Sequence, residues 1–299
     1  MKTWLRRSLW SVGTLVAVGA ATIAAGLFMA ERKMQRNVVV DVRALPLPTD
    51  AVAIERGRYL FASRGCAECH GANGGGRTFI DEDGLRVAGA HISPGPGSVT
   101  AGYAAADWVR TIRHGVKPDG RPVMIMPSED YNRFTDADVG ALVAYVQQMP
   151  AVEGGAAVVQ LPPPVRLMYA FGLVQDAAEK IDHRLPAQQP VAEGPGVEHG
   201  RYVANMCLGC HGDGLSGGKI PGTPPSWPAA ANLTPGEGSV MPAYADEQAF
   251  VRLMRSGKRA DGSAVTVMPF ESLAQMSDVD LRALHAFLLT VPPRPAGGR

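Results

Sequence analysis

The longest uncharged stretch of this 299-residue chain lies near its start. Lys2, Arg6 and Arg7 precede 23 uncharged residues, Ser8 to Ala30, and a mostly basic cluster follows. Such a run is longer than the core of an ordinary signal peptide and long enough to cross a bilayer as a helix. We therefore predict that residues 1–36 form an N-terminal signal anchor with a transmembrane helix, its positive start in the cytoplasm.

The same segment has a second interpretation. The small residues from Ala20 to Ala25 could contain a cleavage site, in which case the mature protein would be soluble in the periplasm. The basic cluster after the apolar run also weakens the charge asymmetry that orients such anchors.

Two later segments repeat apolar residues at the spacing of one helix face. In Thr135–Gln148 and in Ser277–Thr290, a Thr or Ser precedes an Asp, as at the start of a capped helix. The apolar positions are Val139, Leu142, Val143 and Val146 in the first segment and Leu281, Leu284 and Leu288 in the second. We predict a closing helix over each segment.

Two opening helices are predicted upstream, over Ile54–Ser63 and Val197–Met206, with Tyr59 and Tyr202 on their apolar faces. Aromatic residues at such positions are ordinary core residues. We expect each opening helix to cross the closing helix that follows it.

These helix pairs belong to a tandem repeat. The tripeptide Gly-Arg-Tyr occurs at Gly57–Tyr59 and again at Gly200–Tyr202, each time just before a cysteine motif. We name residues 50–150 the first repeat and residues 198–295 the second repeat. Each has the length of one small domain.

Residues 151–197 join the two repeats and contain proline-rich stretches. The middle of this linker, Val165–Ile181, is partly apolar but too short and too interrupted by charge to span a membrane. We predict that it packs across the two repeats, and contact with the bilayer surface is the alternative.

Each repeat carries the pattern Cys-x-x-Cys-His, and the two copies use all four cysteines of the chain. In this pattern two thiols form thioethers to the vinyl groups of one haem, and the adjacent histidine reaches the iron. The sequence therefore predicts two haem c groups. The predicted attachment residues are Cys66, Cys69, Cys207 and Cys210, and the predicted axial iron ligands are His70 and His211.

Other uses of four cysteines are open to an exported chain, namely two disulfides, one shared zinc site or a pair of redox dithiols. None of them explains why a histidine follows both cysteine pairs. Because the chain has only seven histidines, this arrangement would rarely arise by chance.

A methionine near the end of each repeat is the predicted second axial ligand. Met126 and Met268 each precede a proline and follow the haem histidine by 56 and 57 residues. A thioether sulfur favours ferrous iron and raises the reduction potential, which suits an electron carrier. Met124 and Met241 are the rivals, but neither has a methionine at the matching position of the other repeat.

The remaining histidines are His91, His114, His183, His199 and His285. We predict that they are surface residues or supporting residues rather than ligands, because their positions differ between the repeats. Among them, His91 is expected to hydrogen-bond a haem propionate.

Charge adds little to this interpretation. The chain has 29 Lys and Arg against 28 Asp and Glu, and residues 1–36 hold six of the basic and one of the acidic residues. The rest therefore carries about −4, which is too mild to predict a partner and gives no case for nucleic-acid binding.

The chain resembles the bacterial membrane-anchored dihaem cytochromes of the cytochrome c family, which are similar to cytochrome subunits of periplasmic alcohol and gluconate dehydrogenases. The resemblance covers about residues 50–295 and rests on CAECHG, CLGCHG, ANLTPGEGS, HGVKPDGRP, SGKRADGS and the two Met-Pro steps. It implies an all-α fold with a few helices around each haem, and the same Cys, His and Met ligands. Many such subunits carry three haems, whereas this chain has two attachment motifs, and His91 replaces the family's Asn, which is kept at Asn232.

Two functions are compatible with these features. The first is electron transfer from a periplasmic dehydrogenase or quinol-oxidising complex to a soluble cytochrome or terminal oxidase. The alternative is a dihaem redox enzyme, such as a peroxidase or a thiosulfate dehydrogenase, which needs an open or labile position on iron. Methionine in both repeats favours the carrier, with no catalytic residue assigned. Since haem c is attached on the outer side of the bacterial inner membrane, we expect both repeats in the periplasm.

Overall fold

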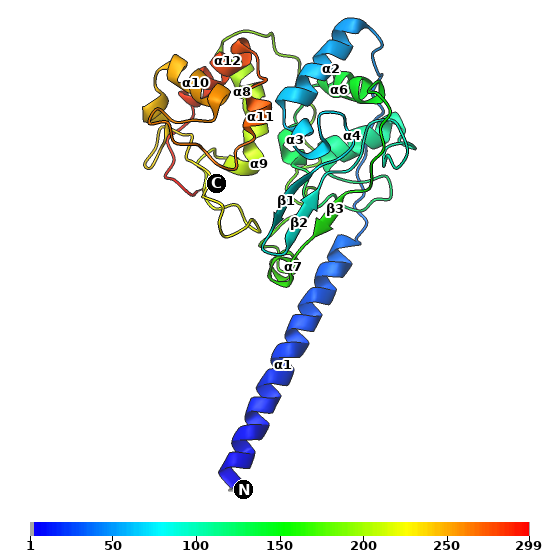
Figure 1. Ribbon diagram of the computed structural model, residues 1–299, viewed down its shortest axis with the longest axis vertical. Coiled ribbons are helices and arrows are strands. Elements are labelled where there is room, and N and C mark those ends of the chain that lie inside the picture. The colour runs from blue at the N-terminus through cyan, green and yellow to red at the C-terminus, as the bar shows by residue number, and fades with distance from the viewer. Residues whose placement is uncertain (1–2, 299) are drawn as a thin grey trace.

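The computed structural model describes residues 3–298 of the chain. Outside this description lie Met1, Lys2 and Arg299, and also the side chains of Leu5 and Arg6. A long helix, α1 (Thr3–Met34), projects from a body formed by the two repeats and the linker (Figure 1). Its stretch Arg7–Met34 could cross a membrane by length and composition, and its side chains are almost all exposed.

The two repeats contain matching sets of short helices. The first repeat contributes α2 (Ala51–Ser63), α3 (Cys66–His70), α4 (Ala105–His114), α5 (Ser128–Tyr131) and α6 (Asp136–Gln147). The second contributes α8 (Val197–Val203), η1 (Ala204–Cys207), α9 (Leu208–His211), η2 (Met241–Tyr244), α10 (Glu247–Ser256), α11 (Phe270–Leu273) and α12 (Asp278–Leu288). The linker adds α7 (Pro163–Ala170). The chain is therefore mostly helical, and its two halves follow one plan.

The closing helices begin where the sequence predicts them. The side chain of Thr135 accepts a hydrogen bond from the backbone N–H of Asp138, and Ser277 does the same for Asp280. Each cap satisfies a backbone donor that the first helical turn leaves unpaired. The first opening helix begins three residues earlier than predicted, because Asp50 caps it.

Opening and closing helices cross at a glycine in each repeat, as expected. A Cβ atom at Gly57 of α2 would lie 2.0 Å from the carbonyl oxygen of Ala141 in α6. At Gly200 of α8 the corresponding distance, to the carbonyl oxygen of Ala283 in α12, is 1.9 Å. The two backbones can approach this closely only because glycine has no side chain.

The first repeat also contains a small sheet, so the all-α prediction is correct only in part. Strands β1 (Thr78–Glu82) and β2 (Leu85–Ala88) form an antiparallel hairpin, and β3 (Val158–Gln160) of the linker pairs with β2. Asp83 and Gly84 make the turn with φ of 51° and 75°. An Asp-Gly pair adopts this left-handed geometry readily, and it matches the twist of the two strands.

The two repeats meet through reciprocal contacts of the opening helices. The Tyr59 hydroxyl donates to Asp280 of the second repeat, and the Tyr202 hydroxyl donates to Asp138 of the first, both at 2.5 Å. The partly buried ring of Tyr59 packs against the core of its own repeat, as predicted, whereas the buried ring of Tyr202 has its centroid 6.0 Å from that of Phe134 in the first repeat. Helical periodicity places the rings but does not show that the hydroxyls reach across to the other repeat.

The linker packs mainly against α1 and the first repeat. Helix α7 lies beside the end of α1, and the backbone N–H of Ala177 donates to the carbonyl of Val123 at 2.9 Å. Contact with the second repeat is limited to places such as Gly222, where a Cβ atom would lie 2.9 Å from Val174. The predicted packing across both repeats is therefore only part of the arrangement.

Candidate haem-binding sites

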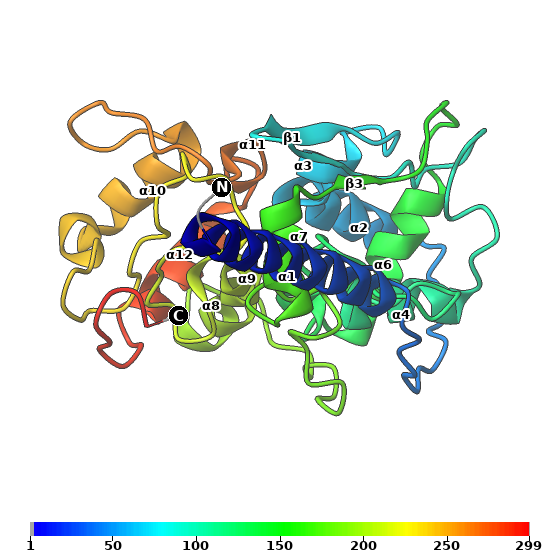
Figure 2. The ribbon, with the colours of Figure 1, turned by 90° about the horizontal axis from the view of Figure 1, so that it is seen from below.

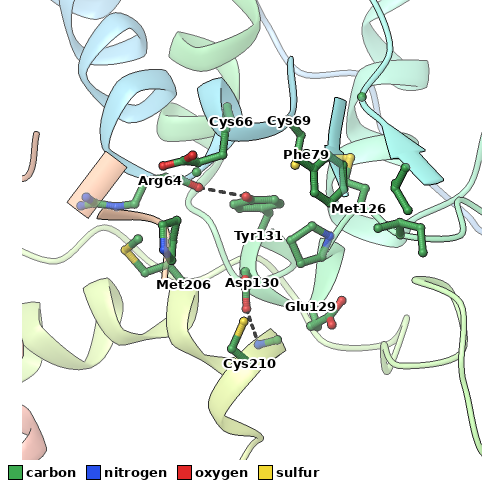
Figure 3. Close-up of a pocket in the computed structure, with 18 of the residues that line it drawn as sticks. Arg64, Cys66, Cys69, Phe79, Met126, Glu129, Asp130, Tyr131, Met206 and Cys210 are labelled. Carbon is green, nitrogen blue, oxygen red and sulfur yellow. Dashed lines mark hydrogen bonds between the residues drawn. The ribbon is translucent and has the colours of Figure 1, made fainter. Parts of the chain in front are cut away.

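One cavity of about 1820 Å³ extends through both repeats, and the Cys-x-x-Cys-His helices α3 and α9 both line it. A single drug-sized ligand takes roughly 300–1,000 Å³, so this space can hold more than one large group. Figure 3 shows Tyr131 and Asp130 between Cys66 and Cys69 on one side and Cys210 on the other. The structure thus brings together the two motifs that lie far apart in the sequence.

Both motif histidines are held in the same way. Nδ1 of His70 lies 2.8 Å from the carbonyl oxygen of Ala90, and Nδ1 of His211 lies 2.8 Å from that of Ala231. A carbonyl can only accept, so each ring donates from Nδ1 and carries its lone pair on Nε2. Burial also lowers the pKa of His70. Both features favour the neutral tautomer that a metal ligand needs.

Burial shifts the acidity of cysteines in both motifs. Burial raises the pKa of Cys66 and of Cys207 to about 12, and that of Cys69 to about 11. Thiols with these pKa values stay protonated at neutral pH. None of the four cysteines forms a disulfide, and among residues 3–298 no three potential ligands gather as a metal site.

The paired methionines occupy equivalent positions. Met126 and Met268 both line the cavity, and the carbonyl of each accepts a hydrogen bond from the residue two positions later, at 2.8 and 2.9 Å. One difference is Val267, directly before Met268, whose φ of 76° is strained for a β-branched residue. The rivals Met124 and Met241 also line the cavity, so position alone does not separate the candidates.

The other five histidines lie outside the cavity lining. His199 contacts Asp280 at 2.6 Å, His285 contacts the Tyr244 carbonyl at 2.8 Å, and the rings of His114 and His183 contact each other. These histidines therefore contact other protein groups rather than the cavity.

His91 is fully buried, and its Nε2 lies 3.2 Å from the hydroxyl of Ser93. Its counterpart Asn232 binds the carbonyl of Arg294, and the backbone N–H of His91 binds that of Gly155. Both residues thus tie a loop to the segment after the closing helix. The Nδ1 atom of His91 is buried and has no partner in the described part of the chain, but His91 does not line the cavity, so the contact with a haem propionate stays a prediction.

A haem also needs partners for its carboxylates, and the sequence reasoning missed the residues that fit. The indole N–H of Trp108 is buried, has no partner in the described part of the chain, and belongs to a residue that lines the cavity. Such a donor needs an acceptor, which a haem carboxylate can supply. Lys117 and Arg259, which occupy matching positions in the two repeats, line the cavity and can supply positive charge. The tandem alignment alone could have identified this cationic pair.

The attachment helices are also held against the opposite repeat. The carboxylate of Asp130 in α5 accepts the backbone N–H of Gly209 in α9 at 2.6 Å. Reciprocally, the carboxylate of Glu68 in α3 accepts the backbone N–H of Ser272 in α11 at 3.0 Å. These bonds fix the relative position of the two haem-attachment sites.

Next to the attachment sites lies a buried ion pair. The side chains of Arg64 and Asp280 are each only 2% exposed, and the guanidinium of Arg64 donates to the carboxylate of Asp280. The same carboxylate also accepts from Tyr59 and contacts His199. A charged pair from both repeats therefore stands beside the cavity, which Arg64 lines.

Comparison with known proteins gives the same picture. The sequence profile described as cytochrome C oxidase, cbb3-type, subunit III matches residues 52–146 and 199–288. The chain is 29% identical to the fructose dehydrogenase cytochrome subunit of Gluconobacter japonicus, over 87% of this chain and 58% of that protein. It is 26% identical to the cytochrome c subunit of the alcohol dehydrogenase (quinone) of Gluconobacter oxydans, over 83% and 56%.

A third relative matches from end to end. The chain is 27% identical to a diheme cytochrome c-type protein of Cereibacter sphaeroides, over 96% of this chain and 99% of that protein. By contrast, it spans little more than half the length of the two dehydrogenase subunits. Because one profile matches both repeats and together covers more than half of the chain, this protein belongs to the cytochrome c family described as cytochrome c oxidase, cbb3-type, subunit III.

Proposed function

We propose that this cytochrome is a dihaem electron carrier, anchored in the bacterial inner membrane by α1 with both haem sites in the periplasm. It takes electrons from a periplasmic dehydrogenase or quinol-oxidising complex and passes them to a soluble cytochrome or terminal oxidase. The observation that carries this proposal is the pair of Cys-x-x-Cys-His helices on one shared cavity. Relatives named as cytochrome subunits of dehydrogenases support a carrier rather than a catalytic subunit.

When bound, haem c supplies an iron that accepts and releases one electron at a time. In each repeat the two motif cysteines would hold one such group covalently, and the backbone carbonyls keep the rings of His70 and His211 in the ligating tautomer. Met126 and Met268 supply a soft ligand that raises the reduction potential. Trp108 and the cationic pair Lys117 and Arg259 would bind the haem carboxylates.

Replacement of the paired methionines tests the proposal. Leucine has a similar volume but cannot bind iron, so Met126→Leu and Met268→Leu should each leave one haem iron without its sixth ligand. We expect each variant to lower the reduction potential of one haem and to bind carbon monoxide at one iron, where the wild type binds little. Optical spectra, carbon monoxide titration and redox titration of the full-length protein measure these changes.

The rival methionines provide the matched control. Met124→Leu and Met241→Leu should leave the spectra and both potentials unchanged if the paired residues are the ligands. A high-spin fraction in the wild type, combined with peroxidase or thiosulfate-oxidising turnover that one of the substitutions abolishes, would instead establish the enzyme alternative.

A further inference from the structure

The C-terminal end of α1 is clamped to the linker by a buried polar network. Arg36 donates to the carboxylate of Asp176 at 2.5 and 2.9 Å, and the Tyr169 hydroxyl donates to the same carboxylate at 2.7 Å. The ammonium group of Lys33 donates to the Tyr169 carbonyl at 2.9 Å. Asp176 and Tyr169 are both 0% exposed, so this network fixes α1 relative to the linker.

This network holds helix α7 beside the last part of the uncharged run of α1. A Cβ atom at Gly26 would lie 2.5 Å from Leu167 and 3.8 Å from Phe171, and Ala30 on the same face of α1 is fully buried. Gly26 lies four residues inside the uncharged run that ends at Ala30, which is about 6 Å along a helix. The run of 23 residues measures about 34 Å, hardly more than a hydrocarbon core of about 30 Å. The part of α7 beside Gly26 therefore lies at the membrane boundary or below it.

The exposed side chains of this region suit such a position. Phe171 and Leu173, in the turn after α7, are 63% and 64% exposed. Seen from the side of α1, α7 lies next to α1 on the face of the body from which that helix projects (Figure 2). Arg166 of α7 pairs with Glu31 of α1 at 3.1 Å, which places charged groups just beyond the apolar run. Exposed apolar side chains on the membrane side of charged groups are typical of interfacial membrane segments.

Resting on the proposed anchor, we infer that residues 163–174, the α7 segment, form a second membrane contact that inserts Leu167, Phe171 and Leu173 among the lipid acyl chains. With two points of attachment, the body cannot rotate freely about α1. The haem cavity, whose lining reaches Leu173 and Met34, then keeps one height and one orientation above the membrane.

Photolabelling from within the bilayer tests this inference. The full-length holoprotein is reconstituted in vesicles of phosphatidylcholine and phosphatidylglycerol that contain a lipid with a diazirine on its acyl chain, and adducts are mapped by mass spectrometry. We expect adducts on α1 and on the α7 segment. The double variant Phe171→Ser with Leu173→Ser should lose most of the α7 adducts, at least several-fold, and keep those on α1.

The controls separate the possible outcomes. Leu289→Ser removes another exposed apolar residue, which follows α12 and is 45% exposed, and should change neither set of adducts. Covalent haem content shows that each variant is folded. Labelled α1 with an unlabelled α7 segment would overturn the second contact and leave the anchor standing, whereas a labelled α7 segment with unlabelled α1 would overturn the anchor alone. If both stay unlabelled, both ideas fail. If a photoreactive group placed at position 171 cross-linked two protein chains, or if the α7 adducts disappeared in native membranes, the α7 segment would contact another protein rather than lipid.

Discussion

Single residues between the repeats carry large electrostatic effects because they are buried. Burial alone would raise the pKa of Asp280, but Arg64 and the hydrogen bonds from Tyr59, Arg64 and His199 outweigh it and lower that pKa to about 2. Asp280 is thus held as the anion that Arg64 requires. A buried charge that loses its partner destabilises a protein far more than an exposed pair does.

Asp280→Asn should therefore destabilise the folded holoprotein by about 3–5 kcal/mol, because Arg64 would keep its charge without a counter-ion. Urea unfolding followed by circular dichroism measures the difference. Asp278→Asn in the same helix is the control, since Asp278 is 67% exposed where it pairs with Arg255, and it should cost less than about 1 kcal/mol. Equal effects of the two substitutions would contradict the role of burial.

The lowered pKa of Asp280 also predicts a pH dependence. The ionised carboxylate is favoured in the folded state, so its contribution is complete above the ordinary pKa of 3.8 and is lost as the pH falls toward 2. The difference of nearly two pH units corresponds to about 2 kcal/mol of unfolding free energy. Unfolding curves of the wild type between pH 5 and pH 2, the range that brackets both pKa values, should show this loss relative to Asp280→Asn. Parallel curves for the two proteins would refute it.

At the scale of helices and strands, the sequence pattern predicts those elements whose cause is local. Thr135 and Ser277 cap the closing helices, and the apolar spacing after them defines the buried face, so both helices lie where the pattern places them. The Asp83–Gly84 pair is a local signal for a hairpin, although the all-α expectation did not include one. Strand β3 has no such signal, because it depends on pairing with β2 about 70 residues away.

The haem sites divide in the same way. The cysteine and histidine ligands follow from a local motif, whereas the carbonyls of Ala90 and Ala231 that orient the histidines lie 20 residues further along the chain. The partner of Asp130 is in the other repeat. Contacts of this kind depend on the packing of the whole chain, so the residue spacing within a motif cannot predict them.

The helix crossings give a prediction at this scale. Gly57→Ala and Gly200→Ala put a methyl group against backbone atoms that cannot move aside alone, so the helices must separate. Overpacking of this kind costs about 1–3 kcal/mol or more. Gly102→Ala is the matched control, because nothing lies within 4 Å of its Cβ position. Thermal unfolding should show a lower Tm for the two crossing variants, and an unchanged Tm would disprove the tight crossing.

For the whole molecule, the decisive quantity is the number of haems per chain. Two attachment motifs on one cavity predict two covalent haems. Replacing both Cys66 and Cys69 by alanine should leave one, held by the second repeat. A pyridine haemochrome assay on purified protein counts them, and the absence of covalent haem from the wild type would rule out the proposed function.

Some contacts between the repeats occur twice with the roles exchanged. Tyr59 reaches Asp280 as Tyr202 reaches Asp138, which is the geometry of an isologous interface between identical subunits. Two separate copies of one repeat could make the same contacts, but only at sufficient protein concentration. Joining them in one chain makes the pairing independent of dilution. It also lets the halves differ, so that Trp108 offers an indole N–H where Phe250, at the matching position, has none.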